Sequence, residues 1–197
     1  FTTSGVLNQI DVMSPGEFVA AGGRDLGSQT DWLDEVTRDA FSMIHNLSAS
    51  GGNGKSSYRV SANLRENEGI LLNSGFDQFN TRLNFTTSAL DDKLKIDFSS
   101  SFTKRDQQNG FNESLRYATL YNPTAPVYAV DAPYAFNGAQ FGGYFETLGL
   151  FDSYNPVSII NQNINNGESK VLNYGLNLTY SLTDNITAYF RTAAQST

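Results

Sequence analysis

The sequence predicts an all-β fold, a partial antiparallel transmembrane β-barrel segment of about seven strands with long extracellular loops. Segments of about ten residues alternate between apolar and polar side chains, which is typical of strands with one apolar face. Short and long connections between strands also alternate along the chain, as they do in barrels that cross an outer membrane. Charged residues make up only 17% of the chain, whereas Phe (14), Tyr (10) and Gly (17) are plentiful.

The alternation places the strands one after another along the chain. The first strand, at 1–7, and the last, at 186–190, are incomplete, and the second, at 41–50, is weaker because Ile44 interrupts its pattern and His45 shares the apolar face. The clear strands are 58–65, 79–86, 93–104 and 171–182. We predict that their apolar side chains point outward to lipid (Leu94, Ile96, Phe98, Leu172, Leu176 and Leu178) and their polar ones to the concave side (Lys95, Asp97, Asn173 and Asn177).

The connections differ in length according to the side of the sheet. Those at 51–56, 89–92 and 183–185 are short, whereas those at 8–40 and 106–170 are long and 66–75 is intermediate. Successive antiparallel strands reverse direction, so all long connections fall on one side, and we expect 8–40 and 106–170 to be extracellular loops. Within the first loop, Ser14-Pro15-Gly16-Glu17 predicts a capped helix that ends at Gly22-Gly23.

Alternation is also compatible with a soluble antiparallel sandwich, so strand length has to separate the two folds. The segments 93–104 and 171–182 are about twice as long as usual sandwich strands and can cross a bilayer at a tilt. About seven strands are too few to close a barrel, so we expect the others from sequence outside this chain or from other subunits.

Composition excludes several functions. The chain has no Cys and a single His, His45, which leaves no disulfide, no thiolate and no His-rich metal site, and no cofactor is expected. The net charge is -7 and no basic cluster stands out, which argues against nucleic acid as a partner. The segment 49–56 resembles a phosphate-binding loop, but a strand follows it instead of a helix. We interpret it as a tight turn whose glycines supply positive φ angles.

The long loop at 106–170 carries the candidate binding residues. Aromatic rings beside Gly, Asn and Pro are suited to stacking on sugars or to holding peptide side chains. The alternative is that they pack the loop against itself or a partner, because a loop of this length must bury some surface to stay ordered. The candidates are Tyr121, Tyr128, Tyr134, Phe136, Phe141, Tyr144 and Phe145.

Several strings of the sequence, in order, resemble one family. They are TDWLDEV at 30–36, HNLSASGG at 45–52, YR at 58–59, NEGI at 67–70, FNTRLN at 79–84, YNPTAPVY at 121–128 and YNPV at 154–157. In this order they resemble the SusC-like TonB-dependent transporters of Bacteroidetes outer membranes, over about residues 11–180. Trp32 within the first string is expected to anchor its loop by packing.

The resemblance implies a function that the pattern of residues alone does not predict. Such proteins are large barrels with an amino-terminal plug, and they import glycans or peptides across the cell outer membrane. A SusD-like surface lipoprotein covers the mouth, and TonB, energised by ExbB and ExbD, acts on the plug. The chain would hold early barrel strands without the plug, the TonB box or the remaining strands, and it would not be an enzyme.

Two other classes remain open on sequence alone. A soluble β-sheet carbohydrate-binding or cell-surface module would use the same aromatic residues. A β-rich glycoside hydrolase would need two loop carboxylates at about 5 to 10 Å in a cleft.

Overall fold

A computed structural model describes residues 14–129, 135–147 and 154–197, without the side chains of residues 136 and 137. The strand expected at 1–7 and the candidate Tyr134 therefore lie outside the described residues. The chain divides into two compact units. One contains residues 40–69, 74–109 and 165–197; the other contains the described residues of 14–39, 70–73 and 110–164.

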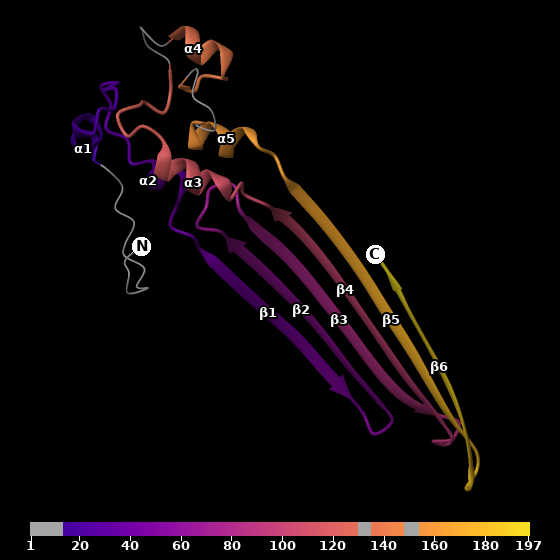
Figure 1. Ribbon diagram of the computed structural model, residues 1–197. Helices are drawn as coiled ribbons and strands as arrows, with labels where there is room; N and C mark the ends of the chain where they lie inside the picture. Colours follow the sequence, from indigo (N-terminus) through magenta and orange to yellow (C-terminus); the bar gives the residue numbers. More distant parts are fainter. Residues whose placement is uncertain (1–13, 130–134, 148–153) are drawn as a thin grey trace, which may run out of the picture. The chain divides into compact units, whose positions relative to one another are not determined.

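The first unit is one antiparallel sheet of six strands, which lie side by side in chain order (Figure 1). The strands are β1 (Ser42–Gly52), β2 (Ser56–Glu68), β3 (Gly75–Ala89), β4 (Leu94–Gln108), β5 (Asn166–Thr183) and β6 (Ile186–Ser196). Every strand predicted from residue 41 onward is confirmed, and each extends beyond its predicted C-terminal end, although β1 and β4 begin one residue later than predicted. The long connection predicted at 106–170 accordingly spans 109–165.

The register confirms that the predicted apolar residues share one face of the sheet. Phe98 lies opposite Phe85 on one side and Leu176 on the other, and Ile96 lies opposite Leu178. Directly opposed residues project from the same face, so these rows form a continuous apolar surface. Its side chains remain partly exposed; Phe85 and Leu64, for example, are 38% and 49% exposed. The predicted polar residues occupy the rows between and form the second face.

The turn after β1 is tight, as predicted, but its glycines act differently from our expectation. None of Gly51, Gly52 and Gly54 has a positive φ. Gly52 is required by space instead, because a Cβ there would lie 2.4 Å from the backbone oxygen of Ser56. Asn53 shapes the turn, since its Oδ1 accepts hydrogen bonds from the amides of Lys55 (2.9 Å) and Ser56 (2.8 Å).

Positive φ angles occur instead in the turn between β3 and β4. Leu90, Asp91 and Asp92 have φ of 55°, 54° and 64°. Asp tolerates this left-handed conformation better than a bulky residue such as Leu. The adjacent carboxylates of this turn are thus explained by backbone geometry.

The second unit is built from short helices. Helix α1 (Pro15–Ala20) has the predicted capping box between Ser14 and Glu17, and the chain turns away at Gly22 with φ 92°. Four further helices were not predicted: α2 (Trp32–Val36), α3 (Glu113–Leu120), α4 (Ala135–Gln140) and α5 (Pro156–Gln162). Each has only five to eight residues, about one to two turns, so its sequence pattern is weak and neighbouring segments decide its conformation. No described helix is long and apolar enough to span a membrane.

A core of its own holds this unit together. The buried apolar residues are Trp32, Val36, Leu71, Ala118, Tyr121, Ala125, Ala129, Phe145, Val157 and Ile160. They come from all three segments of the unit, which are far apart in the sequence. The long connections are therefore ordered by packing against one another within this unit.

Candidate functional site

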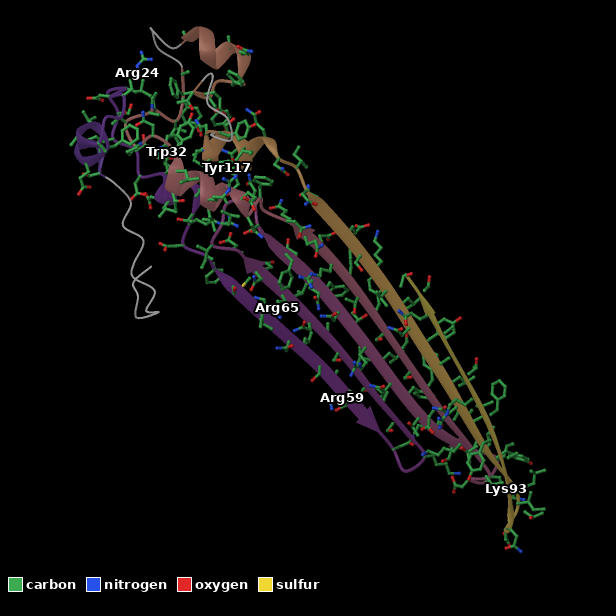
Figure 2. All side chains as sticks on the ribbon, viewed as in Figure 1. Arg24, Trp32, Arg59, Arg65, Lys93 and Tyr117 are labelled. Atoms are coloured by element: carbon green, nitrogen blue, oxygen red, sulfur yellow. The ribbon has the colours of Figure 1, made fainter. Side chains whose placement is uncertain are left out.

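Trp32 anchors the first segment of the helical unit, as the sequence predicted. Its side chain is 1% exposed and contacts Tyr121 edge to face, with ring centroids 4.9 Å apart. The indole Nε1 donates a hydrogen bond to the backbone oxygen of Asn122 (2.9 Å). Figure 2 shows Trp32 and Tyr117 among the helices of this unit. The TDWLDEV and YNPTAPVY strings are thus two halves of one packed structure.

Asn155 fixes the third segment. It is completely buried, and its side-chain Oδ1 caps helix α5 by accepting from the amides of Val157 (3.0 Å) and Ser158 (3.1 Å). Its Nδ2 donates to the backbone oxygens of Val127 and Phe145, both at 2.9 Å. One side chain therefore joins a helix start to the two chain segments that carry the candidate aromatic residues.

Two of the candidate aromatic residues are core residues. Tyr121 and Phe145 are each 4% exposed. The Tyr121 hydroxyl donates to the backbone oxygen of Phe145 (3.3 Å) and accepts from the amide of Thr147 (3.2 Å). Burial raises the pKa of this hydroxyl far above its usual range, and the nearby Glu146 carboxylate raises it further. These rings pack the loop and are placed where a ligand does not reach.

Glu146 lies half-buried beside them. Its carboxylate accepts a hydrogen bond from the Asn155 amide at 3.0 Å. Burial raises the pKa of Glu146 above its ordinary value of 4.5, against hydrogen bonds from the Asn155 amide and the Tyr121 hydroxyl that lower it. Burial has the larger effect, so the folded unit holds the proton of this carboxyl group more tightly than water does.

Tyr128 and Tyr144 form an aromatic pair in which Tyr128 is exposed and Tyr144 is partly buried. The two residues face each other in an antiparallel bridge, and their rings stack with centroids 5.1 Å apart at 29°. Tyr128 remains 52% exposed. Asn161 donates from its Nδ2 to the Tyr144 hydroxyl (3.2 Å). A flat aromatic surface with amide and hydroxyl groups beside it is suited to stacking on a sugar ring.

The remaining candidates are less well placed or not described. Phe141 is half-buried, and its backbone oxygen accepts a hydrogen bond from Gln162 Nε2 (3.0 Å). Phe136 belongs to helix α4, but its side chain, like all of Tyr134, lies outside the described residues.

The polar face of the sheet carries a ladder of side-chain amides. Asn63 donates to Asn46 (2.7 Å), Asn80 donates to Asn63 (3.0 Å) and the Thr103 hydroxyl donates to Asn80 (2.9 Å). These four residues lie in one row across β1 to β4. The ladder was not predicted from the sequence. Its signal was the recurrence of Asn at polar positions of successive strands.

An open hollow of about 640 Å³ lies on the same polar face, over β3 to β6. Two rows of side chains surround it, and the small residues Gly175 and Ala193 leave the space. Its polar lining consists of Arg82, Asn84, Ser99, Ser101, Asn173 and Gln195.

The described residues offer little for catalysis by a metal. No group of three or more His, Cys, Asp or Glu side chains in the described ranges is arranged to hold a metal ion. The single His45 lies opposite Leu64 in the sheet, on the apolar face.

Comparison with known proteins gives two curated relatives, while no family model matches. The TonB-dependent receptor SusC of Bacteroides thetaiotaomicron is 31% identical over 150 residues, which is 71% of this chain and 15% of that protein. The TonB-dependent receptor P26 of Formosa agariphila is 33% identical over 136 residues, which is 68% of this chain and 13% of that protein. The chain thus spans about a seventh of the length of these relatives. With its antiparallel, two-faced sheet, the chain belongs to the SusC-like TonB-dependent receptors and corresponds to a segment of their β-barrel.

Proposed function

We propose that the chain forms part of the wall and outer mouth of an active importer in the cell outer membrane, taking up glycans or peptides. The two faces of the sheet carry this proposal: one face is apolar except near the long connections, where charged residues lie, and the other face is mainly polar. The apolar face contacts lipid, and the polar face lines the water-filled interior.

Strand length supports a membrane position for the sheet. The six strands have between 11 and 18 residues, and a tilted strand of about 9 to 11 residues spans a bilayer. Apolar side chains that stay exposed in a six-stranded sheet find their partner in lipid, and amides on the other face find theirs in water.

The long connections supply the contacts outside the membrane. Connections 69–74 and 109–165 leave the same end of the sheet, because the strands are antiparallel and paired in chain order. We place this end on the extracellular side, where Tyr128 and Tyr144 contact cargo or a SusD-like lipoprotein. TonB, with ExbB and ExbD, acts on the plug region of the complete transporter.

Site-directed spin labelling of the complete transporter in liposomes tests the assignment of the faces. This chain has no Cys, so Leu176→Cys and Asn177→Cys each introduce a single labelling position within it. We expect a nitroxide at 176 to be relaxed mainly by oxygen, which partitions into lipid. A nitroxide at 177 should respond mainly to a water-soluble nickel chelate.

Equal response at the two positions would overturn the membrane assignment. It would favour the second class considered above, a soluble carbohydrate-binding module, which would also stay monodisperse without detergent.

A further inference from the structure

Basic residues are concentrated on the polar face of the sheet, although the chain as a whole has a net charge of -7. Side chains alternate between the two faces along each strand, and the register aligns the strands with one another. Together they assign six basic residues to this face: Arg59, Arg65, Arg82, Lys95, Arg105 and Arg191. Across the six strands, all of which the structure describes, the same face carries one carboxylate, Asp97. The polar face is therefore strongly electropositive in an acidic chain.

The other acidic residues of the strands lie on the opposite face. Glu66, Asp77, Asp106 and Glu168 form one row across β2 to β5. Lys104 lies between Asp106 (2.8 Å) and Glu168 (3.4 Å) and neutralises part of this row. The sheet thus has acidic residues available, and they are sorted away from the arginines.

Most of the arginines have no carboxylate partner within the sheet. The side chains of Arg59 and Arg82 make no hydrogen bond or ion pair among the described residues. Arg65 and Arg105 lie against the ring of Phe76, at 5.1 and 4.0 Å from its centroid, and the Nε of Arg105 is buried without a hydrogen-bond partner. A guanidinium group binds carboxylate or sulfate with two parallel hydrogen bonds, so these groups retain that capacity.

The arginines follow one another along the strands. Arg65 and Arg105 flank Gln78, Arg82 lies four residues further along β3, and Arg59 pairs with Asn84. At about 3.3 Å per residue, the spacings along the strand are about 13 Å and 7 Å. Figure 2 shows Arg65 and Arg59 at successive levels of the sheet. Their arrangement is a track and does not form a single pocket.

The surroundings of Arg82 indicate the chemistry of the ligand. The hollow next to it is lined mainly by hydroxyl and amide groups, with Gly175, Ala193 and Ala194 as its small apolar positions. Tyr174 also borders the hollow, but its place in the strand directs its side chain to the opposite face. A peptide side chain would find no apolar pocket there, whereas sugar hydroxyls would find both donors and acceptors.

We propose that the polar face is a binding track for anionic oligosaccharides, with carboxylate or sulfate groups on the arginines and hydroxyl groups on the Asn and Ser side chains. This inference rests on the proposed function, because it requires the polar face to line the transport path. Several weak anionic sites in series favour passage, since a ligand must also leave each one.

Binding to the complete transporter tests this track. We would titrate it in detergent with hexagalacturonate and with a heparin hexasaccharide, using neutral maltohexaose for comparison. Arg82→Gln is expected to weaken binding of an anionic probe about tenfold, the value of one charge-assisted hydrogen bond. The matched control Lys170→Gln removes the same charge from the opposite face and should leave binding unchanged. Added salt should weaken the binding of the anionic probe only.

Three outcomes would overturn the track. In the first, neither anionic probe binds more tightly than maltohexaose; in the second, Arg82→Gln and Lys170→Gln act alike. In the third, Arg82→Glu leaves probe affinity unchanged but makes cells permeable to a large antibiotic. That result would mean that the plug no longer seals the barrel, so the arginines would bind an acidic surface of the plug and not the probe. The spin labels at 176 and 177 test independently whether the polar face lines the interior of the barrel. Failure of the binding track is therefore distinguishable from failure of the proposed function.

Discussion

Individual side chains decide the stability of the loop structure, and Asn155 carries the greatest number of roles. It caps α5 and satisfies two backbone oxygens on other segments. Loss of a cap costs about 1 kcal/mol, and each lost hydrogen bond costs about 0.5 to 1.5 kcal/mol, since Val127 O and Phe145 O keep their bonds from the Phe145 amide and the Tyr121 hydroxyl. A single amide thus accounts for much of what holds 127–129 beside 143–145.

Replacing Asn155 by Ala should destabilise this unit by about 3 kcal/mol, from the lost cap and the two lost hydrogen bonds to the backbone oxygens of Val127 and Phe145. Hydrogen exchange of the backbone amides of Ala129 and Phe145 in the complete protein would measure the loss. Asn161→Ala is the control, because Asn161 is exposed and bonds the Tyr144 hydroxyl at the surface. If both variants exchange alike, Asn155 does not hold the segments together.

Glu146 should make the same unit less stable as pH rises. Its folded pKa lies above the ordinary value of 4.5, so the folded state holds the proton more tightly than the unfolded state. The stability it contributes is complete below pH 4.5 and is lost as the pH rises through the folded pKa. Glu146→Gln should remove this dependence and keep the hydrogen bond from Asn155.

The opening free energy of the amides at 145 and 155, corrected for intrinsic exchange rates, would show the trend. A wild-type protein whose stability is constant between pH 4.5 and 7 would contradict the assignment.

At the scale of elements, the alternation of apolar and polar residues was enough to predict the strands, because successive side chains of a strand point to opposite faces. The convergence of Arg65, Arg82 and Arg105 on one face required the register as well, since they belong to three strands. The pairing of Trp32 with Tyr121 could not be predicted, because nothing in local sequence links positions so far apart. Helices α2 to α5 depend on that long-range packing and were missed for the same reason.

The turn between β3 and β4 predicts a stabilising substitution. Leu90 has φ 55° and is 62% exposed, so it bears left-handed strain and has little side-chain burial to lose. Leu90→Gly should raise the free energy of unfolding by about 0.5 to 1 kcal/mol, the strain relieved less the added chain entropy. Urea unfolding of the complete protein in lipid would measure it. Leu90→Ala keeps the Cβ and should give no such gain.

The faces of β5 predict opposite responses to charge. Leu176→Arg near the membrane midplane should cost about 2 to 4 kcal/mol in a complete barrel, because the guanidinium enters lipid. Asn177→Arg, one residue along, should cost far less because it enters water. Unfolding from liposomes would compare them, and equal tolerance would show that the faces are not divided between lipid and water.

For the whole molecule, the aromatic side chains of the long connections divide into two groups. Some are buried and stabilise the fold, and others are exposed and can contact a ligand. Tyr121 and Phe145 belong to the core, so deleting the entire connection would also remove the packing partners of Trp32. A substitution at the exposed pair is the sharper test of binding.

Tyr128→Ala in a complete transporter should reduce cargo affinity by about fivefold to tenfold, the contribution of one stacked ring. Tyr154→Ala removes another exposed ring, which packs edge to face on Tyr117, and serves as the control. Growth on the cargo and retention of the lipoprotein would be measured together. Normal values for both in the Tyr128 variant would leave the pair without a role in binding.

Protease added to whole cells would test sidedness, with cleavage expected in 109–165 and not in the turns at 53–55 or 90–93.

Chain-order pairing of the strands also has a kinetic consequence. Most strands follow their neighbour after a short turn, so hairpins can be added to the growing edge one at a time. β5 is the exception: closing the connection 109–165 costs about 2 kcal/mol more in chain entropy than closing the turn at 90–93. The core that includes Trp32, Leu71 and Tyr121 gathers all three long connections and compacts this one. Packing of that core should therefore set the rate at which β5 joins β4, so variants that weaken it should delay barrel assembly before they affect transport.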